Sequence, residues 1–179
     1  MRARDNAAPP SAAALHETAL AMLARRALSH AEIAERLGRR GANAAAVSAE
    51  IARLDRAGLL DEDALARSVC HTQLRAGRGR RAVFAALKRR KIAKDAAEAA
   101  LAELAAGEGE TAALAAAFAK VTDKHRFWRR LPGERRKVVR YLLARGFSLD
   151  LVNRALRENG RDEPHADQTD DAGDPLDLP

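Results

Sequence analysis

The sequence predicts an all-α protein made of three tandem three-helix repeats that form an elongated, curved array. Alanine, leucine, arginine and glutamate, which favour helices, dominate the 179 residues, whereas the β-formers valine, isoleucine and threonine are few. Alanine contributes 43 residues and only six are aromatic, so large apolar side chains are scarce. A unit of about 50 residues with so small a core is marginal alone. Neighbouring units should therefore pack on one another.

A short pattern that recurs three times predicts the repeats. Its copies are Leu37-Gly-Arg-Arg40, Leu87-Lys-Arg-Arg90 and Leu142-Leu-Ala-Arg145, which start 50 and 55 residues apart. In each copy an apolar residue precedes the leucine by four positions, a small or apolar residue follows ten positions after it, and a larger apolar residue follows at fourteen. A period in this range is typical of repeat architectures. The expected divisions are a disordered segment 1–12, repeats 13–58, 59–107 and 108–160, and an acidic disordered tail 161–179.

Capping residues and glycines predict where the helices of the first repeat begin and end. Its first helix is expected over about residues 13–26. Ser29, followed by Glu32, has the spacing of a capping box at the start of the second helix. Asn43 is expected to cap the third helix. Gly41 and Gly58 suit the residues that follow helix ends.

The later repeats carry comparable signals. Asp61 is the expected N-cap of the first helix of the second repeat, whose apolar face should include Leu65, Val69 and Thr72. In the third repeat Pro132 suits the first turn of a helix. Ser148 is expected to cap the last helix, and this completes three helices per repeat.

Charge is unevenly distributed along the chain. The formal net charge is +7, yet residues 162–179 contain seven acidic residues and no lysine or arginine. Without those acids the charge of the chain rises to +14. A basic body with an acidic tail indicates a polyanion or an acidic protein surface as partner. The tail is expected to compete with phosphates for the basic body.

Two basic clusters are the candidate binding site. Residues 75–94 hold nine basic residues and no acid, and residues 120–145 hold ten basic residues against two acids. The alternative is a solvated face in which coding bias favours arginine. That alternative is weaker for two clusters on equivalent helices, because stacked repeats place such helices on related surfaces. The residues expected to contact a partner or nucleic acid are Arg78, Arg80, Arg81, Lys88, Arg89, Arg136 and Arg140.

Phe127 and Trp128 lie inside the second basic cluster. Such aromatics could stack on bases, but packing between units or against a partner is the favoured interpretation. Three-helix units also suggest helix-turn-helix domains. A protein that recognises a specific DNA sequence needs a polar recognition helix, however, and the candidate helices here are mostly arginine and alanine.

No residue constellation in the sequence predicts an enzyme. The stretch Gly77–Gly79 lacks the Gly-Lys-Ser/Thr ending of a phosphate-binding loop. The five histidines are scattered without metal-ligand spacing. Cys70 and His71 are neighbours on a helix and so point about 100° apart, which favours Cys70 as a small core residue. We expect no catalytic residue, no cofactor and no metal.

The expected location is the cytoplasm. A single cysteine excludes an internal disulfide and fits a reducing compartment. The N-terminal residues lack the apolar core of a signal peptide. No apolar run is long enough to span a membrane, so no membrane partner is expected.

Three stretches resemble the RecX family, regulatory partners of the RecA recombinase. The first is Ala24-Arg-Arg-Ala-Leu-Ser-His-Ala-Glu-Ile-Ala-Glu-Arg-Leu37. The second is Gly58-Leu-Leu-Asp-Glu-Asp-Ala-Leu-Ala66, continued by Arg75-Ala-Gly-Arg-Gly-Arg-Arg81. The third is Arg145-Gly-Phe-Ser-Leu-Asp-Leu-Val152. They occur in the family's order, and the resemblance covers roughly residues 14–160.

The resemblance implies a non-catalytic protein that lies in the helical groove of the RecA–DNA filament. It implies suppression of the ATPase, strand-exchange and co-protease functions of RecA, hence regulation of DNA repair and recombination. The alternative is a stand-alone nucleic-acid-binding protein that uses its basic face on single- or double-stranded DNA, weakly and with strong salt dependence. In either case a monomer is expected.

Overall fold

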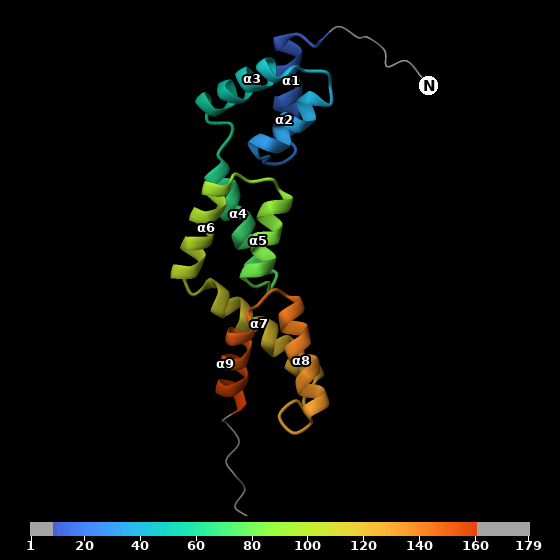
Figure 1. Ribbon diagram of the computed structural model, residues 1–179, viewed down its shortest axis with the longest axis vertical. Coiled ribbons are helices and arrows are strands. Elements are labelled where there is room, and N and C mark those ends of the chain that lie inside the picture. The colour runs from blue at the N-terminus through green and yellow to red at the C-terminus, as the bar shows by residue number, and fades with distance from the viewer. Residues whose placement is uncertain (1–8, 161–179) are drawn as a thin grey trace, which may run out of the picture.

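Nine helices and no strand make up residues 9–160, the part of the chain that the computed structural model describes. Figure 1 shows an elongated molecule with the helices grouped in threes along its long axis. The all-α prediction is confirmed. The helices are α1 (Ala12–Leu23), α2 (His30–Gly38), α3 (Ala44–Arg56), α4 (Glu62–Arg75), α5 (Arg80–Arg89), α6 (Lys94–Ala106), α7 (Gly109–Lys124), α8 (Pro132–Ala144) and α9 (Leu149–Gly160).

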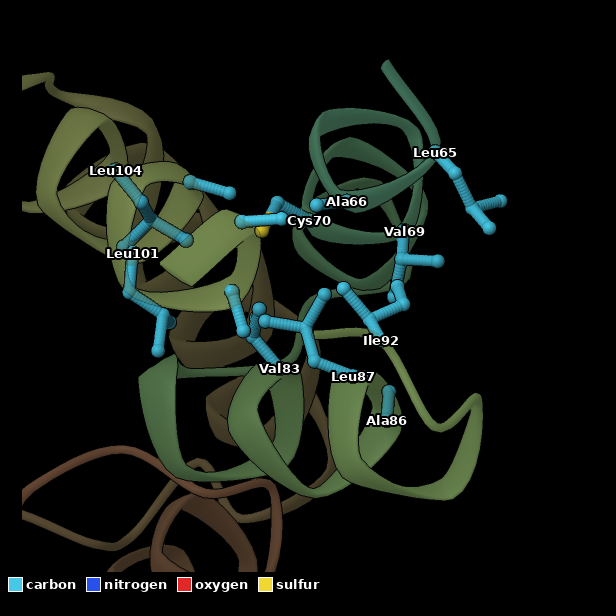
Figure 2. Close-up of a cluster of buried hydrophobic side chains, with 13 residues drawn as sticks. Leu65, Ala66, Val69, Cys70, Val83, Ala86, Leu87, Ile92, Leu101 and Leu104 are labelled. Atoms are coloured by element: carbon cyan, nitrogen blue, oxygen red, sulfur yellow. The ribbon is translucent and has the colours of Figure 1, made fainter. Parts of the chain in front are cut away.

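Three separate hydrophobic clusters form the core, one in each group of three helices. The leucines of the recurrent pattern, Leu37, Leu87 and Leu142, are fully or almost fully buried in the three clusters. Figure 2 shows the middle cluster, in which side chains from α4, α5 and α6 converge around Leu87. Many of its members are alanines, which lets the helices approach closely but removes little apolar surface per residue.

The predicted caps are present. The Ser29 hydroxyl accepts a hydrogen bond from the Glu32 amide, and the Glu32 carboxylate accepts one from the Ser29 amide, which completes the capping box of α2. Asn43 caps α3 and Asp61 caps α4 in the same way. The Ser148 hydroxyl accepts from an amide in the first turn of α9. Each cap satisfies a helix amide that otherwise has no partner.

Three local expectations are wrong. The expected disordered segment was placed to end at residue 12, but Ser11 caps α1 and Ala12 is its first residue, so that boundary is too late. The same helix was expected to run to Arg26, yet it ends at Leu23, and the chain then turns so that Leu28 is buried in the core. Thr72 was placed on the apolar face of α4 but is exposed, because the core face of that helix runs instead through Ala66 and Cys70.

Some expectations are not tested by the structure. The disordered start and the acidic tail fall on residues 1–8 and 161–179, which lie outside the described residues. The division into repeats 13–58, 59–107 and 108–160 is kept as a proposal, with Leu60 packing into the first core cluster although it lies beyond the first boundary. Among residues 9–160, no helix combines the length and apolarity that a bilayer crossing requires.

Candidate interface on the second helices of the repeats

The second helices of the three groups, α2, α5 and α8, lie end to end in a line, here called the second-helix row (Figure 1). The Gly79 and Arg81 amides at the start of α5 donate to the Arg145 and Gly146 carbonyls that follow α8, at 3.0 and 3.1 Å. The Ser29 hydroxyl at the start of α2 donates to the Arg90 carbonyl that follows α5, at 2.8 Å. The C-terminal ends of α5 and α8 therefore each meet the N-terminal end of the second helix in the preceding repeat.

Two arginines of the recurrent pattern join successive repeats. Arg90 donates to the Ala27 carbonyl at 2.8 Å and forms an ion pair with Glu32 at 3.1 Å. Arg145 donates to the Ala76 carbonyl at 2.7 Å. Both carbonyls follow the first helix of the preceding repeat, so the two contacts are equivalent. The guanidinium groups of Arg90 and Arg145 are thus engaged in contacts inside the protein.

The contact between two successive repeats is here called a joint. Glu32 is the electrostatic centre of the first joint, which connects the first and second repeats. Burial of its side chain opposes ionisation, but hydrogen bonds from Arg26 and Arg90 and from the Ser29 amide outweigh that effect and lower the pKa of Glu32 from 4.5 to about 2. The carboxylate thus caps α2 and holds two guanidinium groups at once. Such charge-assisted bonds are stronger than bonds between neutral groups.

We expect acid to weaken this joint. Because the pKa is lowered in the folded protein, the stabilisation is complete above the unfolded value near 4.5 and is lost as the pH falls towards 2. The shift corresponds to about 3 kcal/mol at neutral pH. Glu32→Gln should therefore lower the free energy of urea unfolding at neutral pH and flatten its decline across this acid range. Glu35→Gln is the control, since Glu35 pairs with Lys91 on the exposed surface. Equal losses in both variants would contradict this assignment.

All the side chains expected to bind a partner are exposed, and they lie on or next to α5 and α8 of the second-helix row. Arg78 precedes α5, and the others lie on α5 or α8. None forms an ion pair with a carboxylate in the described part of the chain. The residues concerned are Arg78, Arg80, Arg81, Lys88, Arg89, Arg136 and Arg140. Their role in binding stays a prediction, but their charges are available to solvent.

The structural equivalence of the two clusters is only partial. A shift of 55 residues places Arg81 on Arg136, but it places Lys88 on Leu143 and Arg140 on Ala85. The basic character is therefore shared by the two helices, whereas the individual charged positions are not. On α2 a shift of 50 residues places Arg39 on Arg89, but it places Ala31 on Arg81 and Gly38 on Lys88, so the basic positions are only partly repeated there.

Two apolar side chains that were missed from the sequence, one on α5 and one on α8, lie among these charges and are here called the apolar strip. Phe84 on α5 is 53% exposed, and the same shift of 55 residues places it on Val139 of α8. On α8 the apolar side chains line a shallow cavity of about 590 Å³ together with arginines, and its lining residues are Pro132, Arg135, Arg136, Val139, Arg140, Leu143 and Ala144. A mixed apolar and cationic surface suits a protein partner better than a bare phosphate backbone.

Trp128 packs within the protein, which supports the packing interpretation of the aromatic pair for this residue. It is 4% exposed and makes an edge-to-face contact with Phe118, with ring centroids 5.4 Å apart. Arg129 lies over its ring at 5.0 Å. Phe127 is 63% exposed and remains available to a partner.

Cys70 is a core residue and not a nucleophile. The thiol is buried among α4, α5 and α6 (Figure 2). Burial raises its pKa, and the nearby Glu103 carboxylate raises it further. The thiolate, which is the reactive form, is therefore disfavoured.

Comparison with known proteins decides the family. Models of the second and third three-helix domains of RecX match residues 61–101 and 124–156. A regulatory protein RecX of Pseudomonas fluorescens is 30% identical over 155 residues, which cover 84% of this chain and 94% of that protein. The chain belongs to the RecX family. This family consists of regulatory proteins and not of enzymes, so the prediction of a non-enzymatic protein is confirmed.

Other members agree in sequence and fold. A regulatory protein RecX of Halorhodospira halophila is 29% identical, with 84% of this chain and 91% of that protein covered. The crystal structure of RecX from Lactobacillus salivarius superposes with a TM-score of 0.73 at 20% identity, over 82% of this chain and 95% of that one. The fold of nine helices in the described residues is therefore the RecX fold.

Proposed function

We propose that this protein binds the RecA–DNA filament and inhibits the ATPase, strand-exchange and co-protease activities of RecA, and thereby regulates DNA repair and recombination. Membership in the RecX family of regulatory proteins carries the proposal. The protein acts as a monomer in the cytoplasm and uses no cofactor. Its effect comes from occupying a surface and not from a chemical step.

The second-helix row supplies a physical route for this binding. Its helices follow one another along the long axis of the molecule, so one protein can contact successive positions of a periodic partner (Figure 1). Exposed cations on α5 and α8 attract phosphates without reading bases. The apolar strip of Phe84 and Val139 adds surface that a protein partner can cover.

Co-sedimentation with filaments tests the proposal. RecA filaments assembled on single-stranded DNA with a slowly hydrolysed ATP analogue are pelleted in the presence of the protein. We expect the protein in the pellet with filaments, and in smaller amount with the DNA alone at the same salt concentration. Recovery in the supernatant at every ratio up to equimolar would contradict filament binding.

The second candidate is a stand-alone nucleic-acid-binding function, favoured by the seven cations that lack carboxylate partners in the described residues. We then expect micromolar or tighter binding to single- or double-stranded DNA without RecA, weakening steeply with salt. Arg81→Ala with Lys88→Ala, or Arg136→Ala with Arg140→Ala, should each reduce the slope of log affinity against log salt by about 2, because each substitution removes one cation that binds a phosphate. Fluorescence anisotropy measures both quantities. If both pairs lose DNA binding yet inhibit RecA fully, the basic face serves DNA only.

A further inference from the structure

The last arginine of each copy of the recurrent pattern occupies an equivalent position in its repeat, but the three have different surroundings. These residues are Arg40, Arg90 and Arg145. Arg90 and Arg145 each reach a carbonyl that follows the first helix of the preceding repeat. Arg40 belongs to the first repeat and has no preceding repeat to contact in residues 9–160. Its side chain donates a hydrogen bond to the Thr18 hydroxyl at 3.4 Å. Within residues 9–160, the surface that joins the repeats elsewhere is thus uncovered at this end of the array.

A cavity of about 700 Å³ opens at this uncovered surface, here called the terminal arginine cavity. It is lined by Thr18, Ala21, Met22, Arg25, Arg26, Arg36, Arg39 and Arg40. A shift of 50 residues carries five of these onto the lining of the corresponding cavity in the second repeat, namely Ser68, Thr72, Ala86, Arg89 and Arg90. That second cavity measures only about 300 Å³ and is also lined by Arg26 and Ala27 of the first repeat.

The terminal arginine cavity carries an excess of uncompensated positive charge. Of its five guanidinium groups, Arg26 pairs with Glu32 at 2.9 Å and Arg39 approaches Glu35 at 3.7 Å. The other three, Arg25, Arg36 and Arg40, form no ion pair with a carboxylate in the described part of the chain. Like charges that share a cavity repel one another, so an anionic occupant is favoured.

We infer that the terminal arginine cavity is a docking site for an acidic polypeptide segment of a partner protein, which presents a carboxylate and a backbone carbonyl to Arg40 and its neighbours. The protein contains the template for this recognition. At the joint between the first and second repeats, the equivalent Arg90 donates hydrogen bonds to the Glu32 carboxylate and to the Ala27 carbonyl. The site lies on the first repeat, apart from the basic face of α5 and α8, and goes beyond the proposed function.

Two other occupants fit less well. A second copy stacked in the manner of the internal joints would present the segment that follows α7, which carries Arg126 and Arg129, and these would repel the cavity. Phosphate would also satisfy the charge, since its oxygens accept hydrogen bonds from guanidinium groups, but the joint at Arg90 supplies a carboxylate and a separate backbone carbonyl from one polypeptide segment. A carboxylate-bearing chain end or helix end provides both groups.

Fluorescence anisotropy with two probes tests the inference. The probes are a short labelled helical peptide of alanine and glutamate and a labelled single-stranded DNA. The full-length variant Arg36→Glu with Arg40→Glu is compared with Arg53→Glu plus Arg56→Glu, which makes the same charge change on the exposed surface of α3. We expect the first variant to lose peptide affinity by at least about tenfold. The control should keep it, and DNA affinity should fall equally in both.

Circular dichroism establishes that each variant is folded, and Arg36→Gln with Arg40→Gln gives a milder version should charge reversal disturb α2. Failure of the wild-type protein to bind the peptide, or equal loss in both variants, would overturn the inference. A loss of DNA affinity specific to the cavity variant, with peptide binding retained, would assign the cavity to phosphate and overturn it as well.

Discussion

Replacing Gly79 with alanine is expected to destabilise the protein by about 3 kcal/mol, the upper range for inserting an atom into packed structure. A β-carbon at this position would lie 2.6 Å from the Phe147 backbone nitrogen and 2.7 Å from the Gly146 carbonyl carbon. Both contacts are with backbone, so no side-chain rotation can relieve them. The start of α5 would have to separate from the end of α8.

The opposite side of this joint is equally tight. Gly146 has φ +90°, a backbone conformation that favours glycine, and a β-carbon there would lie 2.5 Å from the Ala82 backbone nitrogen. Two glycines from repeats far apart in sequence thus allow the α5–α8 junction of the second-helix row to close. The buried ring of Phe147 fills the remaining space.

Urea unfolding followed by circular dichroism measures the effect. Gly133→Ala is the matched control, because Gly133 lies in the first turn of α8, where an added β-carbon would meet no atom within 4 Å. We expect this control to be neutral or to stabilise by up to about 1 kcal/mol, since alanine is the better helix former. A Gly79→Ala protein as stable as the control would show that the joint is looser than the structure indicates.

Removal of four charges from the second-helix row should have the largest effect on function. In the variant Arg81→Ala, Lys88→Ala, Arg136→Ala and Arg140→Ala, we expect that at least about tenfold more protein is needed to slow ATP hydrolysis by RecA, equivalent to about 1.4 kcal/mol of binding free energy. The fold should be kept, because all four side chains are exposed and form no ion pair in the described structure.

A control with the same charge loss separates the row from net charge. Arg53→Ala, Arg56→Ala, Arg154→Ala and Arg157→Ala remove four exposed arginines from the third helices α3 and α9. This control is expected to lose some DNA affinity through long-range electrostatics but to inhibit RecA nearly as well as the wild-type protein. Equal loss of inhibition in both variants would mean that only total charge matters.

Local signals in the sequence were sufficient to predict most of the helices. The Ser29–Glu32 capping box, the Asn43 and Asp61 caps and Pro132 act within one helical turn, so the residues that specify them are close in sequence. The buried leucines followed from the recurrent pattern for the same reason. Errors arose where a tertiary contact overrode the local preference, as at the early end of α1 before the buried Leu28.

The contacts between repeats could not be predicted from neighbouring residues. Arg90 and Arg145 look like any other exposed basic residue in sequence, yet their partners lie 63 and 69 positions earlier. Alignment of the repeats alone would have paired Phe84 with Val139, because the two stand 55 positions apart; neither is among the buried core residues. The charge and exposure of the seven predicted site residues follow from the local sequence pattern, so the sequence alone was sufficient to predict both.

The rate of ATP hydrolysis by RecA on single-stranded DNA tests the central claim most directly. The rate is measured at fixed RecA and DNA while the protein is added from substoichiometric to equimolar amounts. If the protein binds the filament through the second-helix row, the rate falls at substoichiometric ratios, and the variant lacking the four row charges requires far more protein for the same fall. An unchanged rate at every ratio up to equimolar would contradict the account.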